Sequence, residues 1–198
     1  LPPTFPPRAG RRQQDLPRKQ ALALRAAGLV RHGEVIALDA GSTNSAIAAM
    51  LPRDLQLRVV TNAPDIALVL MAGEGVEVSL IGARLDRRSG AVLGSQAMEC
   101  LAELHVDVCF AGTCAIDREG TAWAVDGEEA AFKRALVRCA DRIVVVVSNE
   151  KLGAIASHRI ASREQVDVLV VEADAPTALV DALRLQGLDV IVSGAPSS

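Results

Sequence analysis

The chain has 198 residues, of which 50% are hydrophobic and 23% are charged, and its formal net charge is −3. This length and composition suit one domain with a substantial core, and they exclude a disordered, collagenous or disulfide-scaffold protein. The longest stretch without a charged residue, 40–52, is too short and too polar to span a membrane, and no signal peptide opens the chain. We therefore expect a soluble, cytoplasmic protein that makes no membrane contact.

Charge is divided unevenly along the chain. Residues 1–31 carry seven Lys or Arg and one acid, a net of +6, whereas the remainder carries 14 basic and 23 acidic residues, a net of −9. The basic head could contact phosphate backbones, but a solvated linker is the favoured interpretation. Residues 1–17, which contain five prolines, are predicted to be a lead-in or linker, and residues 18–198 are predicted to form the domain.

Aromatic, cysteine and histidine residues exclude further classes. Phe and Trp number four together, too few for nucleic-acid binding by base stacking. No spacing matches a zinc finger or a metal-binding helix, so we expect reduced core thiols, a structural His105, a surface loop at His158 and no metal site. The residues concerned are Cys100, Cys109, Cys114, Cys139, His32, His105 and His158.

Short apolar runs rich in Val and Ile alternate with segments of helical periodicity. Strands are predicted at 34–39, 57–61, 76–81, 106–111, 142–147, 167–171 and 188–192. Helices are predicted at 18–30, 43–51, 64–72, 95–104, 127–140 and 175–186. This alternation predicts an α/β fold with a mostly parallel sheet covered by helices on both faces. Residues 82–94 interrupt it as a hairpin or loop, and residues 112–125 interrupt it again.

The sharpest local signal lies where the first predicted strand ends and a helix begins. This segment contains Asp39, Gly41, Ser42, Thr43 and Asn44. Gly41 permits close backbone approach, the three polar residues after it offer donors, and the helix start adds partial positive charge. The segment suits a phosphate or a carboxylate, although a plain helix N-cap explains the same residues equally well.

Polar residues also follow the second and third strands, at the sheet edge where ligands bind in such folds. Thr61 and Asn62 end the second strand, and Gly82 and Arg84 follow the third. These loops open onto one cleft with the first if their strands are neighbours. Arg84 could bind a phosphate, but arginines in such a loop are more often solvated.

Four more candidates lie further along the chain. Asp117 could bind sugar hydroxyls or could form an Asx turn. Glu129 and Lys133 lie in the longest predicted helix, where a capping box with Asp126 and an i,i+4 ion pair explain them without a ligand. Lys151 is one of three lysines against 18 arginines, and its place after an apolar strand hints at a selected ammonium group.

Taken in order, these loops resemble the C-terminal effector-sensing domain of DeoR-type bacterial transcriptional regulators. The resemblance runs from about Lys19 to Ser193. Its segments are Lys19-Gln20-Ala21-Leu22-Ala23, Gly33-Glu34-Val35-Ile36, Asp39-Ala40-Gly41-Ser42-Thr43, Val60-Thr61-Asn62, Phe110-Ala111-Gly112, Ile116-Asp117, the run from Asp126 to Arg134, and Lys151-Leu152-Gly153.

The resemblance implies a Rossmann-like fold related to ribose-5-phosphate isomerase and CoA transferases. It implies a sensor for a phosphorylated sugar or a similar metabolite, with no catalytic residues and no cofactor. Thirteen residues would form its ligand site: Asp39, Gly41, Ser42, Thr43, Asn44, Thr61, Asn62, Gly82, Arg84, Asp117, Glu129, Lys133 and Lys151. It also implies a homo-oligomer, dimer or tetramer, that contacts DNA only through an N-terminal winged helix–turn–helix, which we expect upstream of residue 1.

The sequence departs from the family pattern at several positions. The family usually has Asp where this chain has Ser148, Gly-Gly where it has Gly82-Ala83, and Asn-Gly where it has Cys114-Ala115. The related isomerase has its key carboxylates where Ala111 and Cys114 stand, and proton transfer between sugar carbons needs such a base. A sensor is therefore favoured over two alternatives, an isomerase-like or CoA-transferase-like enzyme and a pure dimerisation module.

Overall fold

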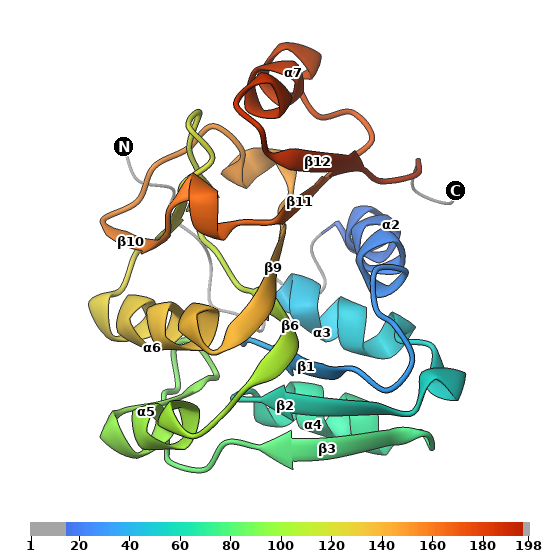
Figure 1. Cartoon of the computed structure of the whole chain (residues 1–198), viewed down its shortest axis with the longest axis vertical. Coiled ribbons are helices and arrows are strands. Elements are labelled where there is room, and N and C mark those ends of the chain that lie inside the picture. The colour runs from blue at the N-terminus through green and yellow to red at the C-terminus, as the bar shows by residue number, and fades with distance from the viewer. Residues whose placement is uncertain (1–14, 196–198) are drawn as a thin grey trace.

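The computed structural model describes residues 15–195 and is built on a seven-stranded parallel sheet (Figure 1). The strands lie in the order β12-β11-β9-β6-β1-β2-β3, and every neighbouring pair is parallel. This confirms the predicted α/β class. The strands are β1 (Val35–Leu38), β2 (Leu57–Thr61), β3 (Val76–Leu80), β6 (Val106–Ala111), β9 (Ala140–Val146), β11 (Val168–Val171) and β12 (Asp189–Val192).

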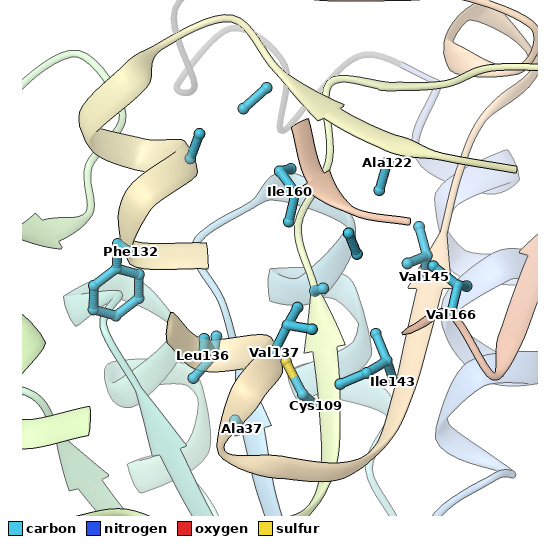
Figure 2. Packing of buried hydrophobic residues seen from close by; sticks show 14 of the residues in the cluster. Ala37, Cys109, Ala122, Phe132, Leu136, Val137, Ile143, Val145, Ile160 and Val166 are labelled. Atoms are coloured by element: carbon cyan, nitrogen blue, oxygen red, sulfur yellow. The ribbon is translucent and has the colours of Figure 1, made fainter. Parts of the chain in front are cut away.

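Helices cover both faces of the sheet, which explains why its central strands are apolar at nearly every position. One face buries the apolar sides of α2, α3 and α4, and the other buries those of α5, α6 and α7. Figure 2 shows Phe132 and Leu136 of α6 in the second core. The helices are α2 (Leu16–Ala27), α3 (Ser42–Met50), α4 (Pro64–Met71), α5 (Ser95–Ala102), α6 (Gly127–Arg138) and α7 (Thr177–Leu185), with 3-10 turns η1 (Arg53–Leu55), η2 (Asn149–Lys151) and η3 (Arg163–Gln165).

Two small antiparallel elements occupy the interruptions in the pattern. Residues 82–94 contain the predicted hairpin, formed by β4 (Arg84–Leu85) and β5 (Val92–Leu93). A three-stranded sheet that the sequence did not predict contains β7 (Ala115–Ile116), β8 (Ala122–Ala124) and β10 (His158–Ala161). Its strands are two to four residues long, too short for a recognisable alternation.

Some predicted boundaries shift by two or three residues. Helix α2 begins at Leu16, because Pro17 fits the first helical turn, where its missing N–H is not needed. The helix ends at Ala27, and Leu29 and Val30 follow in tighter backbone turns. The part of the predicted lead-in at 1–14 lies outside the described residues.

The cysteine and histidine predictions need correction. All four cysteines are free, but only Cys109 is fully buried, and Cys114 and Cys139 are half-buried. Cys100 is exposed, because it falls on the solvent side of α5 beside the buried Leu101. His105 is exposed and contacts Asp141 at 3.2 Å, so it lies on the surface rather than in the core. His158 is exposed as expected but begins strand β10.

The strand order reverses between β1 and β6. From β1 the chain builds outward through β2 and β3, and it then returns to add β6, β9, β11 and β12 on the other side. Loops leaving the two central strands therefore diverge at their carboxyl ends, which is where open α/β sheets bind ligands. No helix within 15–195 is long and apolar enough to cross a membrane.

Candidate functional site

A pocket lies at this reversal point, above the carboxyl ends of β1 and β6. Its cavity volume is about 40 Å³, and the non-atom space reaches about 530 Å³ only when the open solvent at its mouth is included. The walls come from the start of α3, the loop after β6, one side of α6, the β4–β5 hairpin and the turn η2. Its lining residues are Ala40, Gly41, Ser42, Thr43, Asn44, Ser89, Gly112, Thr113, Cys114, Glu129, Lys133, Val146 and Lys151.

Helix α3 starts at the pocket without a side-chain cap. Gly41 is its N-cap residue and makes no side-chain cap hydrogen bond. The N–H groups of Ser42, Thr43 and Asn44 have no carbonyl partner within the helix, as at every helix start. The Asn44 side chain donates to the carbonyls of Asp39 and Phe110, both at 2.8 Å, and so ties β1 to β6. The turn therefore offers backbone donors and the positive end of a helix dipole.

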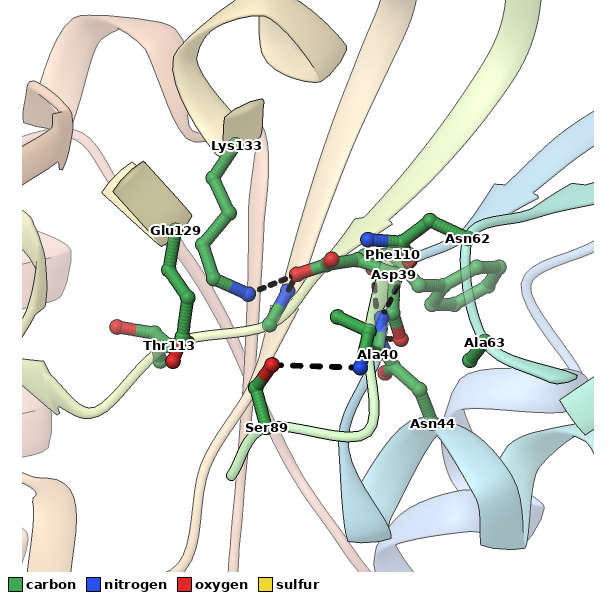
Figure 3. Close-up of polar contacts among 12 residues, drawn as sticks. Asp39, Ala40, Asn44, Asn62, Ala63, Ser89, Phe110, Thr113, Glu129 and Lys133 are labelled. Carbon is green, nitrogen blue, oxygen red and sulfur yellow. Dashed lines mark hydrogen bonds and ion pairs between the residues drawn. The ribbon is translucent and has the colours of Figure 1, made fainter. Parts of the chain in front are cut away.

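A buried ion pair forms the floor of the site (Figure 3). Lys133 extends from α6, and its Nζ pairs with Oδ2 of Asp39, with 6% and 1% of the two side chains exposed. The same oxygen accepts the Gly112 N–H at 2.9 Å. Burial alone would lower the pKa of Lys133, but the nearby Asp39 and Glu129 carboxylates outweigh it and raise the pKa. Lys133 is therefore held as an ammonium, and its charge is balanced by Asp39.

Gly112 is required by this ion pair. A Cβ at this position would lie 2.5 Å from Oδ2 of Asp39 and 3.0 Å from Nζ of Lys133. Neither atom can withdraw, since each is fixed by the other. Any larger residue would therefore displace the floor of the pocket.

Glu129 lies one helical turn before Lys133 and also lines the pocket. Burial raises the pKa of its carboxyl, and the opposing attraction of Lys133 is too weak to cancel that effect. Of the predicted capping box, the Asp126 half is present, because its Oδ1 accepts the Glu128 and Glu129 N–H groups at 2.9 and 3.0 Å. The predicted i,i+4 ion pair is replaced among the described residues by pairs of Lys133 with Asp39 and of Glu129 with Arg88. The Glu129 side chain lines the pocket, where it can accept hydrogen bonds from hydroxyl groups.

Lys151 brings a second ammonium group to the opposite wall. Its Nζ donates to the Thr113 carbonyl at 3.1 Å, and both residues line the pocket. Lys133 and Lys151 therefore place two ammonium groups at the same pocket.

The β4–β5 hairpin closes one side of the pocket through Ser89. The hairpin is held against the start of α6 by two arginines. Arg84 pairs with Glu128 at 2.9 Å, and Arg88 pairs with Asp126 at 2.8 Å and reaches Glu129 at 3.6 Å.

The structure brings together seven of the thirteen predicted site residues and places Asp39 directly behind them. Thr61 and Asn62 are buried nearby, but their side chains form hydrogen bonds with backbone groups. The Thr61 hydroxyl donates to the Leu38 carbonyl at 2.6 Å, and Oδ1 of Asn62 accepts the Ala40 N–H at 2.9 Å. They shape the loop that leads to α3, and neither lines the pocket.

Gly82, Arg84 and Asp117 do not line the pocket either. Arg84 is exposed in its pair with Glu128, and Gly82 has open space beside it. Asp117 is buried, with one oxygen accepting two backbone N–H groups at 3.0 and 2.8 Å and the other accepting Nε1 of Trp123 at 2.8 Å. The Asx-turn alternative therefore describes Asp117, because its carboxylate is already saturated.

Six lining residues were missed: Ala40, Val146, Ser89, Gly112, Thr113 and Cys114. A usable signal existed for the last three, because they follow the fourth strand, which borders the reversal point. Ser89 could not be found in this way, since it reaches the pocket from a hairpin turn.

Comparison with known proteins identifies the family. The profile of the DeoR C terminal sensor domain matches residues 14–173. The chain belongs to the DeoR family. It is 32% identical over 178 residues to the HTH-type transcriptional regulator GlpR of Haloferax volcanii, covering 90% of this chain and 69% of that protein. It is 28% identical over 165 residues to the glycerol-3-phosphate regulon repressor of Escherichia coli K12, covering 83% and 66%.

This DeoR-family chain spans about two thirds of the length of the curated relatives it matches. Its fold also resembles ribose 5-phosphate isomerase A of Methanocaldococcus jannaschii, with a TM-score of 0.51 and 19% identity over 70% of this chain and 55% of that one. That likeness concerns the fold alone. The curated relatives are transcriptional regulators, which favours the sensor over the enzyme alternative. Within residues 15–195 there is no cluster of three or more His, Cys, Asp or Glu side chains that could hold a metal ion.

Proposed function

We propose that residues 18–198 form an effector sensor that binds a phosphorylated sugar or a related phosphorylated metabolite. The observation that carries this proposal is the shared position of two anion-binding features. The uncapped start of α3 and the ammonium group of Lys151 line the same pocket. In the intact regulator, occupancy of the pocket would modulate DNA binding by an N-terminal winged helix–turn–helix.

A phosphate group suits the α3 end of the pocket. Consecutive backbone N–H groups at a helix start bind phosphate oxygens, and the helix dipole favours their negative charge. Lys151 adds a charge-assisted donor from the turn η2. The remainder of the ligand would meet Glu129, whose carboxyl oxygens suit hydroxyl groups.

Two further observations support a regulator. A relative that is 28% identical is a glycerol-3-phosphate regulon repressor, a name that refers to a small phosphorylated polyol. Ala111 and Cys114 stand where the isomerase would need carboxylates, so a base for proton transfer is missing there. A homo-oligomer, dimer or tetramer, remains part of the proposal.

Calorimetric titration with a panel of phosphosugars and glycerol 3-phosphate tests the site. We expect one or more members to bind, and Lys151→Ala to weaken that binding by about tenfold or more, the value of one charge-assisted hydrogen bond. Thr43→Ala should weaken it less, because the backbone donors remain. Arg87→Ala, which removes an exposed charge outside the pocket, serves as the control. The assignment fails if no member binds, or if binding ignores both pocket changes.

A further inference from the structure

A closed set of hydrogen bonds links the first turn of helix α2 to the turn η2. Nη1 of Arg18 donates to Oε2 of Glu172 at 2.8 Å and to Oδ1 of Asp174 at 3.0 Å. The Asn149 backbone N–H donates to the same Glu172 oxygen at 2.9 Å, and its side-chain amide donates to the same Asp174 oxygen at 2.9 Å. We call these four residues the Arg18 network.

The buried member of the network is Glu172, which directly follows β11 and has 7% of its side chain exposed. A carboxylate this buried needs compensating donors, because the loss of its hydration is costly. Arg18 and the Asn149 N–H supply them at one oxygen. The hydrogen bond from Arg18 also lowers the pKa of Asp174, which keeps that carboxylate ionised as an acceptor.

Asn149 connects the network to the ligand pocket. It is the first residue of η2, and Lys151 is the last. The Lys151 N–H donates to the Ser148 carbonyl at 3.0 Å, which closes the turn, and its Nζ reaches Thr113 in the pocket wall. Holding the Asn149 backbone therefore holds the turn from which the Lys151 ammonium projects.

Helix α2 also packs on the other anion-binding element. Leu22 and Ala26 of α2 share an apolar core with Ile47 of α3, and all three are fully buried. Figure 1 shows the two helices side by side on one face of the sheet. Helix α2 thus contacts α3 through its apolar side and η2 through Arg18. It is also the first helix of the described chain, on the side where a C-terminal sensor joins the rest of a regulator.

We propose that Arg18, Glu172 and Asn149 are positioning residues for Lys151, and that they couple the pocket to helix α2. This inference rests on the proposed function, because it requires Lys151 to contact the ligand phosphate. A phosphate that binds the Lys151 ammonium displaces η2. This displacement changes the hydrogen bonds that Asn149 and Arg18 donate to Glu172, and it thereby changes the position of the first turn of α2. If the ligand changes the conformational equilibrium of α2 by some factor, then by linkage a change imposed on that equilibrium alters ligand affinity by the same factor.

Hydrogen exchange on the ligand-free chain tests the positioning role. Arg18→Gln should speed exchange of the backbone amides at 149–153 by about tenfold, because a charge-assisted hydrogen bond supporting the turn is lost. Arg25→Gln makes the same substitution at an exposed position of the same helix and should leave those amides unchanged. Glu172→Gln, which keeps an acceptor but removes the buried charge, should have an intermediate effect.

Titration of the same variants with the tightest-binding member of the phosphosugar panel tests the coupling. We expect Arg18→Gln to weaken binding several-fold and Arg25→Gln to leave it unchanged. The ligand should alter exchange at 16–20 in the wild type and not in Arg18→Gln. The proposal is overturned if Arg18→Gln matches the wild type in both exchange at 149–153 and affinity. If the wild type binds no panel member, the proposed function fails and the coupling with it, while exchange still decides the positioning role.

Discussion

Two sets of strand-end loops in this molecule carry the same kinds of polar residue but use them differently. At the reversal point, the start of α3 and Lys151 present donors to an open pocket. At the ends of β2 and β7, Thr61, Asn62 and Asp117 form hydrogen bonds with nearby backbone groups and with the Trp123 side chain. Residue type and strand-end position therefore do not identify a ligand residue. The two sets differ in whether their residues line the pocket.

The largest effect in this comparison should come from Lys133, which borders the pocket but serves the fold. We expect Lys133→Met to lower the free energy of unfolding by about 3–5 kcal/mol, because it leaves the buried Asp39 carboxylate uncompensated. Urea denaturation measures the change. The double variant Asp39→Asn/Lys133→Met removes both charges, keeps an acceptor for Gly112 and should recover part of the loss. A single variant as stable as the wild type would contradict a buried ion pair.

Asp117 should separate the two kinds of loop most clearly. Asp117→Ala leaves two backbone N–H groups and Nε1 of Trp123 without their acceptor, and we expect a loss of about 2 kcal/mol in stability. Affinity for the panel ligand should stay within about twofold of the wild type, within the scatter of a substitution outside the pocket. Lys151→Ala should show the reverse, with weak binding and nearly unchanged stability. A ligand-binding defect in Asp117→Ala that exceeds its stability defect would break the distinction.

The smallest effect should be the pH dependence that Glu129 confers. Its carboxyl has a raised pKa in the folded chain, so the folded state keeps a proton that the unfolded state has already released. The resulting stabilisation is complete below the usual pKa of a glutamate and is lost as pH rises through the raised value. Protonation of Glu129 also removes a negative charge from the pocket. The affinity for sulfate, used here as a probe anion, should therefore increase on acidification. Glu129→Gln should flatten the pH dependence of both the stability and the sulfate affinity. Denaturation and sulfate titration at a series of pH values measure the two, and identical profiles for the wild type and the variant would contradict this expectation.

Most of the fold could be predicted because its signals are long. The seven parallel strands and six helices each present apolar residues in recognisable periods, and the hairpin at 82–94 was marked by its interruption of the pattern. The three-stranded sheet could not be found, because β7, β8 and β10 are too short to show a period. The exposure of Cys100 could not be predicted either, because it depends on which side of α5 faces the core. Its neighbour Leu101 is the residue that is buried in that helical turn.

The site was predictable only where a whole segment carried the signal. The glycine and polar residues from Gly41 to Asn44 mark a strand-to-helix turn of the kind that suits an anion, and they line the pocket. The position of Gly112 after the fourth strand is visible in the sequence, but its need to be glycine is not, because that depends on Asp39 and Lys133 meeting beside it. Ser89 depends on how a hairpin folds over α6. Contacts between distant segments decided these roles, and no local pattern encodes them.

The ion pair between Asp39 and Lys133 also has a consequence for how the chain folds. The two residues are separated by 94 positions, and they meet only after β1, β6 and α6 have docked. Contacts of such long range form late in folding, because closing the intervening loop costs entropy before the contact contributes. The pocket floor is thus one of the last features to assemble. A chain that lacks α6 has neither Lys133 nor Glu129, so the pocket cannot be completed before that helix has docked.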